Sequence, residues 1–191
     1  HKAYPKVHIS TITAATHGTL EALRAQKIDL GVVFSPVEED DDLELIPVCP
    51  IHDMFIAGKP FLHLKDAVLP LAEIARLPII CPEKDTSTRQ YLDAFFRAHG
   101  VVLEHHRLDL EGADAVPLDF ELATTVLIVP FVERGLGVGI TVRRFAEASL
   151  REGTVFEITP EHPIPERAIA VVTRRKAPLS HAGRALIRCL T

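Results

Sequence analysis

One stretch of the sequence, from Leu77 to Gly100, restricts the fold more than any other because it joins a buried strand to a helix. Its first residues form the continuous apolar run that is typical of a strand inside a sheet. After a polar turn, Leu92, Phe95 and Phe96 follow a spacing of three and four residues, which predicts a helix with one apolar face. Gly100 is expected to end this helix, since glycine tolerates the left-handed conformation after a last turn.

Hydroxyl side chains crowd the start of this predicted helix, where Asp85 is followed by Thr86, Ser87 and Thr88. Side-chain oxygens at such positions cap free backbone N–H groups, and the helix dipole leaves partial positive charge there. A site of this kind can hold a carboxylate, sulfate or phosphate. At the end of a strand in an open α/β sheet, it would also lie on the edge where ligands bind. The alternative, from this stretch alone, is a well-capped helix without a ligand.

The rest of the chain repeats the alternation of strand and helix. Strands are expected at Val7–Thr13, Ile28–Phe34, Arg107–Leu110, Val138–Val142, Thr154–Ile158 and Arg167–Thr173, with two more inside Leu43–Ala57. Helices are expected at Thr19–Gln26, Leu69–Arg76 and Arg144–Arg151, and after a capping Ser180. Residues 122–134 are either a strand, which their β-branched side chains favour, or a short helix with Pro130 in its first turn. The alternation predicts an α/β class with mostly parallel strand pairing.

The N-terminal third predicts a βαβ unit. It consists of the strand Val7–Thr13, the helix Thr19–Gln26 with Thr16 as its cap, and the strand Ile28–Phe34. The last of these is too continuously apolar for an exposed sheet edge, so it is expected inside the sheet.

Length, charge and cysteine content limit the classes of function. The 191 residues suffice for one domain or for two small lobes. A formal charge of −5 argues against a nucleic-acid surface, which needs clustered Lys and Arg. No apolar run approaches the roughly 20 residues that span a bilayer, and the N-terminus lacks the apolar core of a signal peptide. Three scattered cysteines give no disulfide framework, which favours a reducing, cytoplasmic setting.

No motif commits the chain to catalysis. The glycines from Gly135 to Gly139 lead into a strand rather than a helix, so they do not form a dinucleotide-binding loop. His105 and His106 are neighbours on a predicted strand, which turns them to opposite faces and makes them a poor metal chelate. His52 with Asp53 has no accompanying nucleophile motif. We therefore expect no enzymatic activity, no cofactor and no metal.

Five blocks of the sequence carry a resemblance to a known family. They are LEALRAQKIDLGVV (20–33), FIAGKP (55–60), LPIICPEKDTSTRQYLDAFFRAHGV (77–101), FVERGLGVGI (131–140) and IPERAIAVVTRRKAPLSHAGRALI (164–187). In this order and spacing, along nearly the whole chain, they resemble the C-terminal effector-binding domain of LysR-type transcriptional regulators.

The resemblance implies a fold similar to type 2 periplasmic binding proteins, in which two crossover strands join two Rossmann-like α/β lobes. Lobe I would take residues 1–77 and 155–191, and lobe II residues 78–154. The family's domain usually opens with one more strand and helix ahead of Tyr4, and we expect these to lie outside this chain together with part of the pocket.

The resemblance also implies a small effector held between the lobes, and the hydroxyl-capped helix start favours an anionic one. Its contacts would come from hydroxyls of Thr16, Thr86, Ser87, Thr88 and Thr141. The whole regulator would be a homodimer or tetramer that binds DNA only through an N-terminal helix-turn-helix absent from this chain, with no membrane contact. The alternative is a solute-binding protein of a transporter with the same fold.

Overall fold

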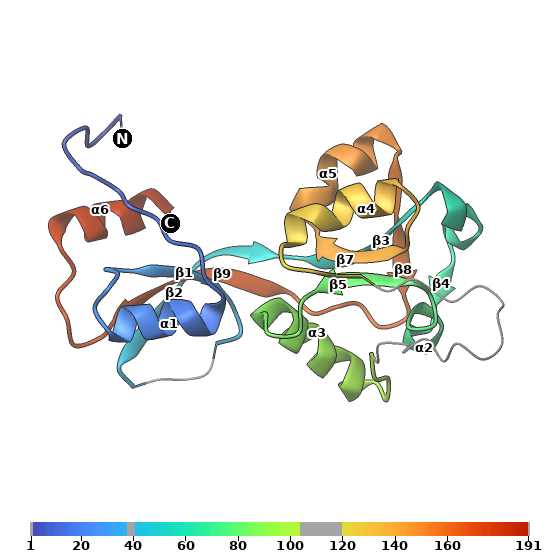
Figure 1. Cartoon of the computed structure of the whole chain (residues 1–191), viewed down its shortest axis with the longest axis horizontal. Helices are drawn as coiled ribbons and strands as arrows, with labels where there is room; N and C mark the ends of the chain where they lie inside the picture. The colour runs from blue at the N-terminus through green and yellow to red at the C-terminus, as the bar shows by residue number, and fades with distance from the viewer. Residues whose placement is uncertain (1, 38–40, 104–119, 191) are drawn as a thin grey trace. The chain divides into compact units, whose positions relative to one another are not determined.

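The computed structural model describes residues 2–37, 41–103 and 120–190, and the chain divides into two compact units (Figure 1). The first unit comprises His1–Pro50 and Arg167–Thr191, and the second comprises Ile51–Glu166. The chain therefore passes from one unit to the other twice. The predicted strand Arg107–Leu110 and the pair His105 and His106 lie outside the described residues.

The first unit is a small sheet with two helices. Its strands follow the order β1 (Gly31–Phe34), β9 (Arg167–Arg174) and β2 (Leu43–Ile51), and its helices are α1 (Thr16–Arg24) and α6 (His181–Leu190). The helices flank this sheet from opposite sides (Figure 1). Leu20 and Leu23 of α1 pack against Val33, Leu43 and Val172 of the sheet, and this cluster is the core of the unit.

The predicted βαβ unit is not formed. Residues 7–13 have no regular secondary structure, and the side chains of Ile9 and Ile12 are exposed. A strand needs a partner ladder and a face to bury, and no described strand pairs with this segment. β1 consequently lies at the edge of the sheet with Val32 exposed, and it pairs antiparallel to β9. The prediction that Ile28–Phe34 lies inside the sheet was therefore wrong.

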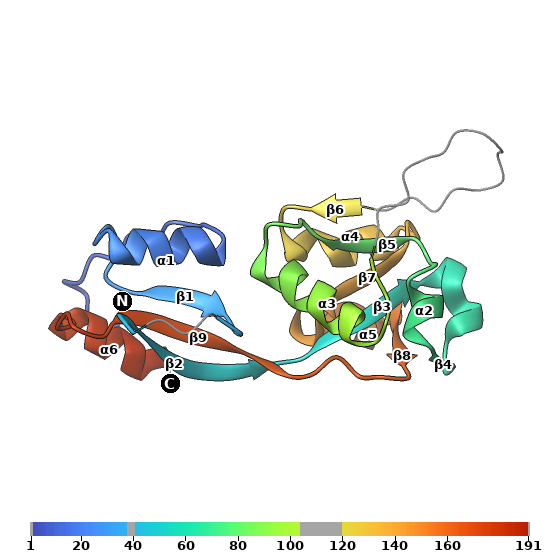
Figure 2. The same ribbon diagram turned by 90° about the horizontal axis from the view of Figure 1, so that it is seen from below.

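The second unit is built on a larger sheet (Figure 2). Its strands follow the order β4 (Val68–Leu69), β8 (Val155–Pro160), β3 (Asp53–Gly58), β7 (Val138–Val142), β5 (Ile79–Pro82) and β6 (Phe120–Leu122). Its α-helices are α2 (Leu71–Ile74), α3 (Ser87–Ala98), α4 (Ile128–Glu133) and α5 (Arg143–Glu152), and 3₁₀ turns span Lys59–Leu64 and Thr125–Leu127. The predicted strand-turn-helix unit is present as β5 followed by α3.

Strand pairing in the second unit is mixed. β5 runs parallel to β6 and β7, and β4 runs parallel to β8. β3 instead runs antiparallel to both of its neighbours, β7 and β8. The α/β class is confirmed, whereas the expectation of mostly parallel pairing was wrong. The alternation of strands and helices along the chain indicates a sheet covered by helices, but it does not show whether a given strand pairs parallel or antiparallel to its neighbours.

The limits of the two units differ from the predicted lobe limits at 77/78 and 154/155. β3 and β4 precede residue 77 and β8 follows residue 154, yet all three pair within the sheet of the second unit. Because these strands pair within the second sheet, the chain passes between the two units at 50/51 and 166/167 rather than at the predicted positions.

Helices cover both faces of the second sheet. α2 and α3 pack on one face, where Leu92, Phe95 and Phe96 join Phe55 and Ile140 in the larger core. α4 and α5 pack on the other face. A Cβ on Gly139 of β7 would meet Ile128 and Val132 of α4 at 2.6 Å, so glycine allows α4 to approach the strand.

The open interpretation of residues 122–134 is settled in favour of the short helix. β6 ends at Leu122, and α4 carries Pro130 in its first turn. Gly135 follows α4 with a φ of 74°, a left-handed conformation that glycine adopts without steric cost.

The predicted N-cap of α6, Ser180, can be tested by mutation. The Ser180 hydroxyl accepts a hydrogen bond from the Gly183 N–H at 3.0 Å, as its predicted capping role requires. Replacing Ser180 by alanine is expected to cost about 1 kcal/mol of unfolding free energy. Chemical denaturation measures this loss. Ser180→Asn, which keeps a capping acceptor, should retain most of the stability, and an equal loss in both variants would contradict the capping role.

Candidate functional site

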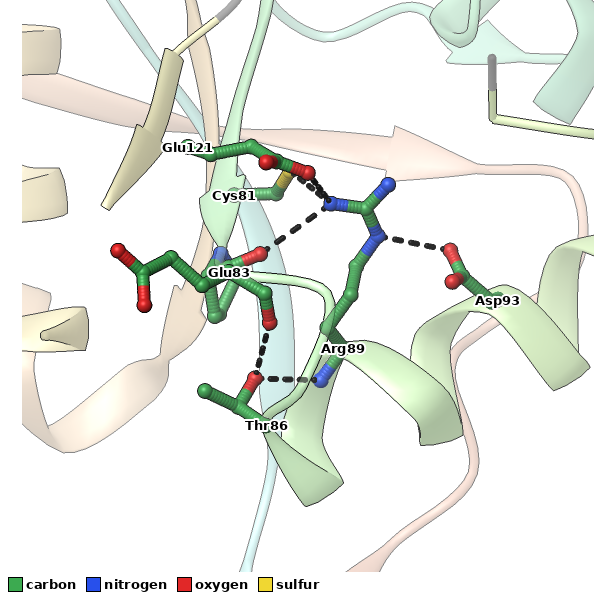
Figure 3. A network of polar contacts seen from close by, with 7 residues as sticks. Cys81, Glu83, Thr86, Arg89, Asp93 and Glu121 are labelled. Atoms are coloured by element: carbon green, nitrogen blue, oxygen red, sulfur yellow. Dashed lines mark hydrogen bonds and ion pairs between the residues drawn. The ribbon is translucent and has the colours of Figure 1, made fainter. Parts of the chain in front are cut away.

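The start of α3 carries the cap that the sequence predicted. The Thr86 hydroxyl accepts from the Arg89 backbone N–H at 3.2 Å and donates to the Glu83 carbonyl oxygen at 2.7 Å (Figure 3). Thr86 thus joins the turn after β5 to the first turn of the helix. Ser87 and Thr88 are the first two helical residues, Ser87 half-buried and Thr88 buried.

Thr141 lies at the same edge of the sheet as these hydroxyls. β7 and β5 run parallel with Gly139 beside Ile80, so Thr141 and Pro82 each stand two residues further, at the carboxyl ends of their strands. α3 begins shortly after the end of β5. Carboxyl ends of adjacent parallel strands form the edge where α/β proteins bind ligands.

The hydroxyl of Thr141 is buried and has no hydrogen-bond partner among the described residues. The residue is only 1% exposed. A buried hydroxyl without a partner costs about 1–3 kcal/mol, and such groups are rare in folded proteins. The carboxyl end of β7 therefore holds a buried hydroxyl, that of Thr141, which makes no hydrogen bond to the described residues.

Thr16 lies in the first unit, and its predicted capping role was wrong. Ala15 is the N-cap of α1, with extended backbone angles and no side-chain cap, and Thr16 is already the first helical residue. A residue inside the first turn has helical backbone angles, which leaves the cap position to the residue before it. As a ligand contact, Thr16 stays a prediction.

Arg89 is the residue of this region that sequence reasoning missed. Its side chain is 2% exposed. The Nε atom donates to Asp93 Oδ1 at 2.8 Å, and Nη1 donates to Glu121 Oε1 at 2.8 Å (Figure 3). Nη1 also lies 3.2 Å from the Pro82 carbonyl oxygen and 3.1 Å from Cys81 Sγ. One guanidinium thus contacts β5, β6 and α3.

A sequence signal for Arg89 existed. It stands three residues before Leu92 and seven before Phe96, on the same helical face as both. A carboxylate follows at the i+4 position, Asp93. An arginine on an apolar face with such a partner indicates a buried ion pair rather than a solvated charge.

The guanidinium of Arg89 stays charged. Burial by itself lowers the pKa of Arg89, but the hydrogen bond and charge of Asp93, the neighbouring Cys81 and the hydrogen bond to Glu121 outweigh it and raise the pKa above its ordinary value. A raised arginine pKa means that the stabilising charge is present at every pH below the alkaline range. Changes of pH near neutrality therefore do not remove the positive charge of Arg89 from this network.

Other chemistry is sparse in the part of the chain that the structure describes. It contains no group of three or more His, Cys, Asp or Glu side chains placed to hold a metal ion. His52 pairs through Nε2 with Glu166 at 3.3 Å, and both side chains are exposed. None of the described helices has the length and apolar character needed to cross a membrane.

Comparison with known proteins identifies the family. The LysR substrate binding domain matches residues 1–191. An HTH-type transcriptional regulator of Escherichia coli K12, YeiE, is 24% identical over 182 residues, which cover 95% of this chain and 57% of that protein. SsuR, an HTH-type transcriptional regulator of Burkholderia cenocepacia, is 25% identical over 137 residues, 72% of this chain and 40% of SsuR. The chain thus spans at most 57% of these relatives.

Solved structures have the same fold. The regulatory domain of Synechocystis CcmR, in complex with 2-PG, aligns with a TM-score of 0.80 at 18% identity over 99% of this chain and 84% of that one. The effector binding domain of QuiR, in complex with shikimate, aligns with a TM-score of 0.75 at 18% identity over 98% and 81%. These neighbours have the periplasmic-binding-protein-like fold that the resemblance implied. The chain accordingly belongs to the LysR substrate binding domain family, the effector-binding part of LysR-type transcriptional regulators.

Proposed function

We propose that this domain binds a small anionic effector at the carboxyl edge of the second unit's sheet, through Thr141 and the hydroxyls of Thr86, Ser87 and Thr88. The observation that carries this proposal is the buried Thr141 hydroxyl, which has no partner among the described groups. It lies at the edge where α3 begins. A ligand atom at this position would satisfy the hydroxyl and remove its desolvation cost.

The start of α3 supplies the preference for an anion. α3 has 12 residues, so its aligned peptide dipoles place partial positive charge at Ser87 and Thr88. Carboxylates, sulfate and phosphate are the ligands that such helix starts hold. Arg89 would not contact the anion directly, since its Nε and Nη1 are bonded to carboxylates and to β5.

The effector would act through the whole regulator. The named relatives are HTH-type transcriptional regulators longer than this chain, so DNA contact is assigned to their remaining part. The chain's charge of −5 agrees with that assignment. Effector binding would shift a dimer or tetramer between two states with different affinity for DNA, in the cytoplasm. The domain would bind its effector without transforming it. A transporter's solute-binding protein is not favoured, because the matched family is regulatory.

A thermal-shift screen with a Thr141→Val variant tests the site. Small carboxylates, sulfate, phosphates and amino acids are added to the domain, and any compound that binds the folded state raises Tm by mass action. Valine keeps the shape of threonine and removes a hydroxyl that has no partner among the described residues, so the ligand-free variant should be as stable as the wild type or more stable. Its ligand-induced rise in Tm should fall strongly, and Thr88→Val should lose part of it.

Thr154→Val is the matched control. Thr154 directly precedes β8, so it lies at the amino ends of β7 and β8, opposite to the carboxyl end that carries Thr141. Its hydroxyl donates to Glu133 at 2.9 Å. This variant should keep the full ligand response. An unchanged response in Thr141→Val would remove Thr141 from the site, and no response of the wild type to any compound would refute an anion site formed by this domain alone.

A further inference from the structure

A closed ring of contacts surrounds the start of α3. The Arg89 guanidinium binds Glu121, and the next residue of β6, Leu122, accepts from the Glu83 N–H at 3.2 Å through its carbonyl oxygen. The Glu83 carbonyl accepts from the Thr86 hydroxyl, which itself accepts from the Arg89 N–H. Figure 3 shows Glu83, Thr86, Arg89 and Glu121 of this ring. Each contact depends on the next, so the turn, the helix start and β6 hold one another in place.

β6 is the weakest member of this ring. It is three residues long, and among the described strands it pairs only with β5. So short an edge strand has little stability of its own. Besides this pairing, its described contacts include the Arg89–Glu121 ion pair, the hydrogen bond from the Glu83 N–H to the Leu122 carbonyl, and an edge-to-face contact between Phe120 and Phe131 with centroids 5.1 Å apart. The ion pair is the part of this support that reaches α3.

We propose that Glu121 and Arg89 are positioning residues of the effector site, and that their ion pair fixes the geometry of the hydroxyls at the start of α3 by holding β6 in register. This inference rests on the proposed ligand site and deepens it. Groups that bind a ligand through several directed hydrogen bonds need supporting contacts of this kind, because small misplacements weaken every bond at once.

Asp93 offers a matched comparison within the same network. Both carboxylates lie 2.8 Å from the same guanidinium. Their side chains are comparably exposed, 20% for Asp93 and 31% for Glu121. Asp93 connects Arg89 to its own helix at the i+4 position, whereas Glu121 connects it to β6. Glu121→Gln and Asp93→Asn therefore remove equal charge and each weaken one charge-assisted hydrogen bond to Arg89, but only Glu121→Gln weakens the ring.

The experiment compares both variants with the wild type in two measurements. The first is the affinity for sulfate, inorganic phosphate and shikimate, from the dependence of Tm on ligand concentration. The second is amide hydrogen exchange of the ligand-free protein at residues 83–89. We expect Glu121→Gln to bind about tenfold more weakly, by analogy with the low end of the loss seen when partners that orient metal-binding side chains are removed. It should also exchange faster at residues 83–89. Asp93→Asn should change both quantities much less.

Equal losses of affinity in the two variants, or equal exchange at residues 83–89, would overturn the positioning role, because a merely stabilising ion pair would act alike from either carboxylate. If the wild type binds none of the three probes, the anion site fails. The exchange comparison then still decides whether Glu121 positions the helix start, so the two failures are distinguishable.

Discussion

Replacement of Arg89 by methionine is expected to lower the free energy of unfolding by about 3 kcal/mol, the lower end of the cost of breaking a buried ion pair. Methionine fills much of the space of the arginine stem, so the loss reports the guanidinium. Asp93 and Glu121 lose their partner, and the Pro82 carbonyl loses a donor. The lower end applies because both carboxylates keep partial contact with solvent. Chemical denaturation with a constant m-value measures this loss.

Arg143→Met provides the control for this experiment. Arg143 Nη2 lies 2.5 Å from Glu157 Oε2, and both side chains are substantially exposed. Surface ion pairs of this kind contribute up to about 1 kcal/mol. Similar losses in Arg89→Met and Arg143→Met would show that burial of the Arg89 network does not determine its contribution.

Replacement of Phe96 by alanine is expected to cost about 3–5 kcal/mol of unfolding free energy. Phe96 is fully buried on the inner face of α3. Its ring meets Phe55 edge to face at 5.9 Å between centroids and Phe95 at 5.7 Å. Truncation removes both contacts and leaves a cavity between α3 and the sheet, which close-packed neighbours fill only in part. Equilibrium denaturation checks the value.

Phe145→Ala is the matched control, because Phe145 lies on α5 with an exposed ring. Its truncation should change stability by roughly 0.5 kcal/mol or less, as for other surface positions. A loss below about 1 kcal/mol in Phe96→Ala would mean that α3 does not depend on this contact. In that case the sheet would not hold the hydroxyl-bearing start of α3 through its apolar face.

Local patterns in the sequence determined much of the fold. The apolar run, the hydroxyl cap and the glycine stop between Leu77 and Gly100 predicted β5 and α3, because each depends on residues only a few positions apart. The cap at Thr86 was predicted for the same reason. So was the short helix containing Pro130, one of the two alternatives that the pattern left. The order of five blocks along the chain was enough to indicate the family, which the match over residues 1–191 confirms.

Tertiary structure alone decided the features that depend on residues far apart in the chain. β3 enters its sheet antiparallel, and β1 lies at an edge, because pairing direction is set by distant partners rather than by local alternation. Glu121 follows Arg89 by 32 positions, so only the pairing of β6 with β5 brings its carboxylate to the guanidinium. Thr141 was named from a family resemblance, but its burial, with no hydrogen-bond partner among the described residues, depends on packing against the rest of the sheet. Capping and periodicity are short-range effects that a sequence displays, whereas burial and ion pairing arise once the chain has folded back on itself.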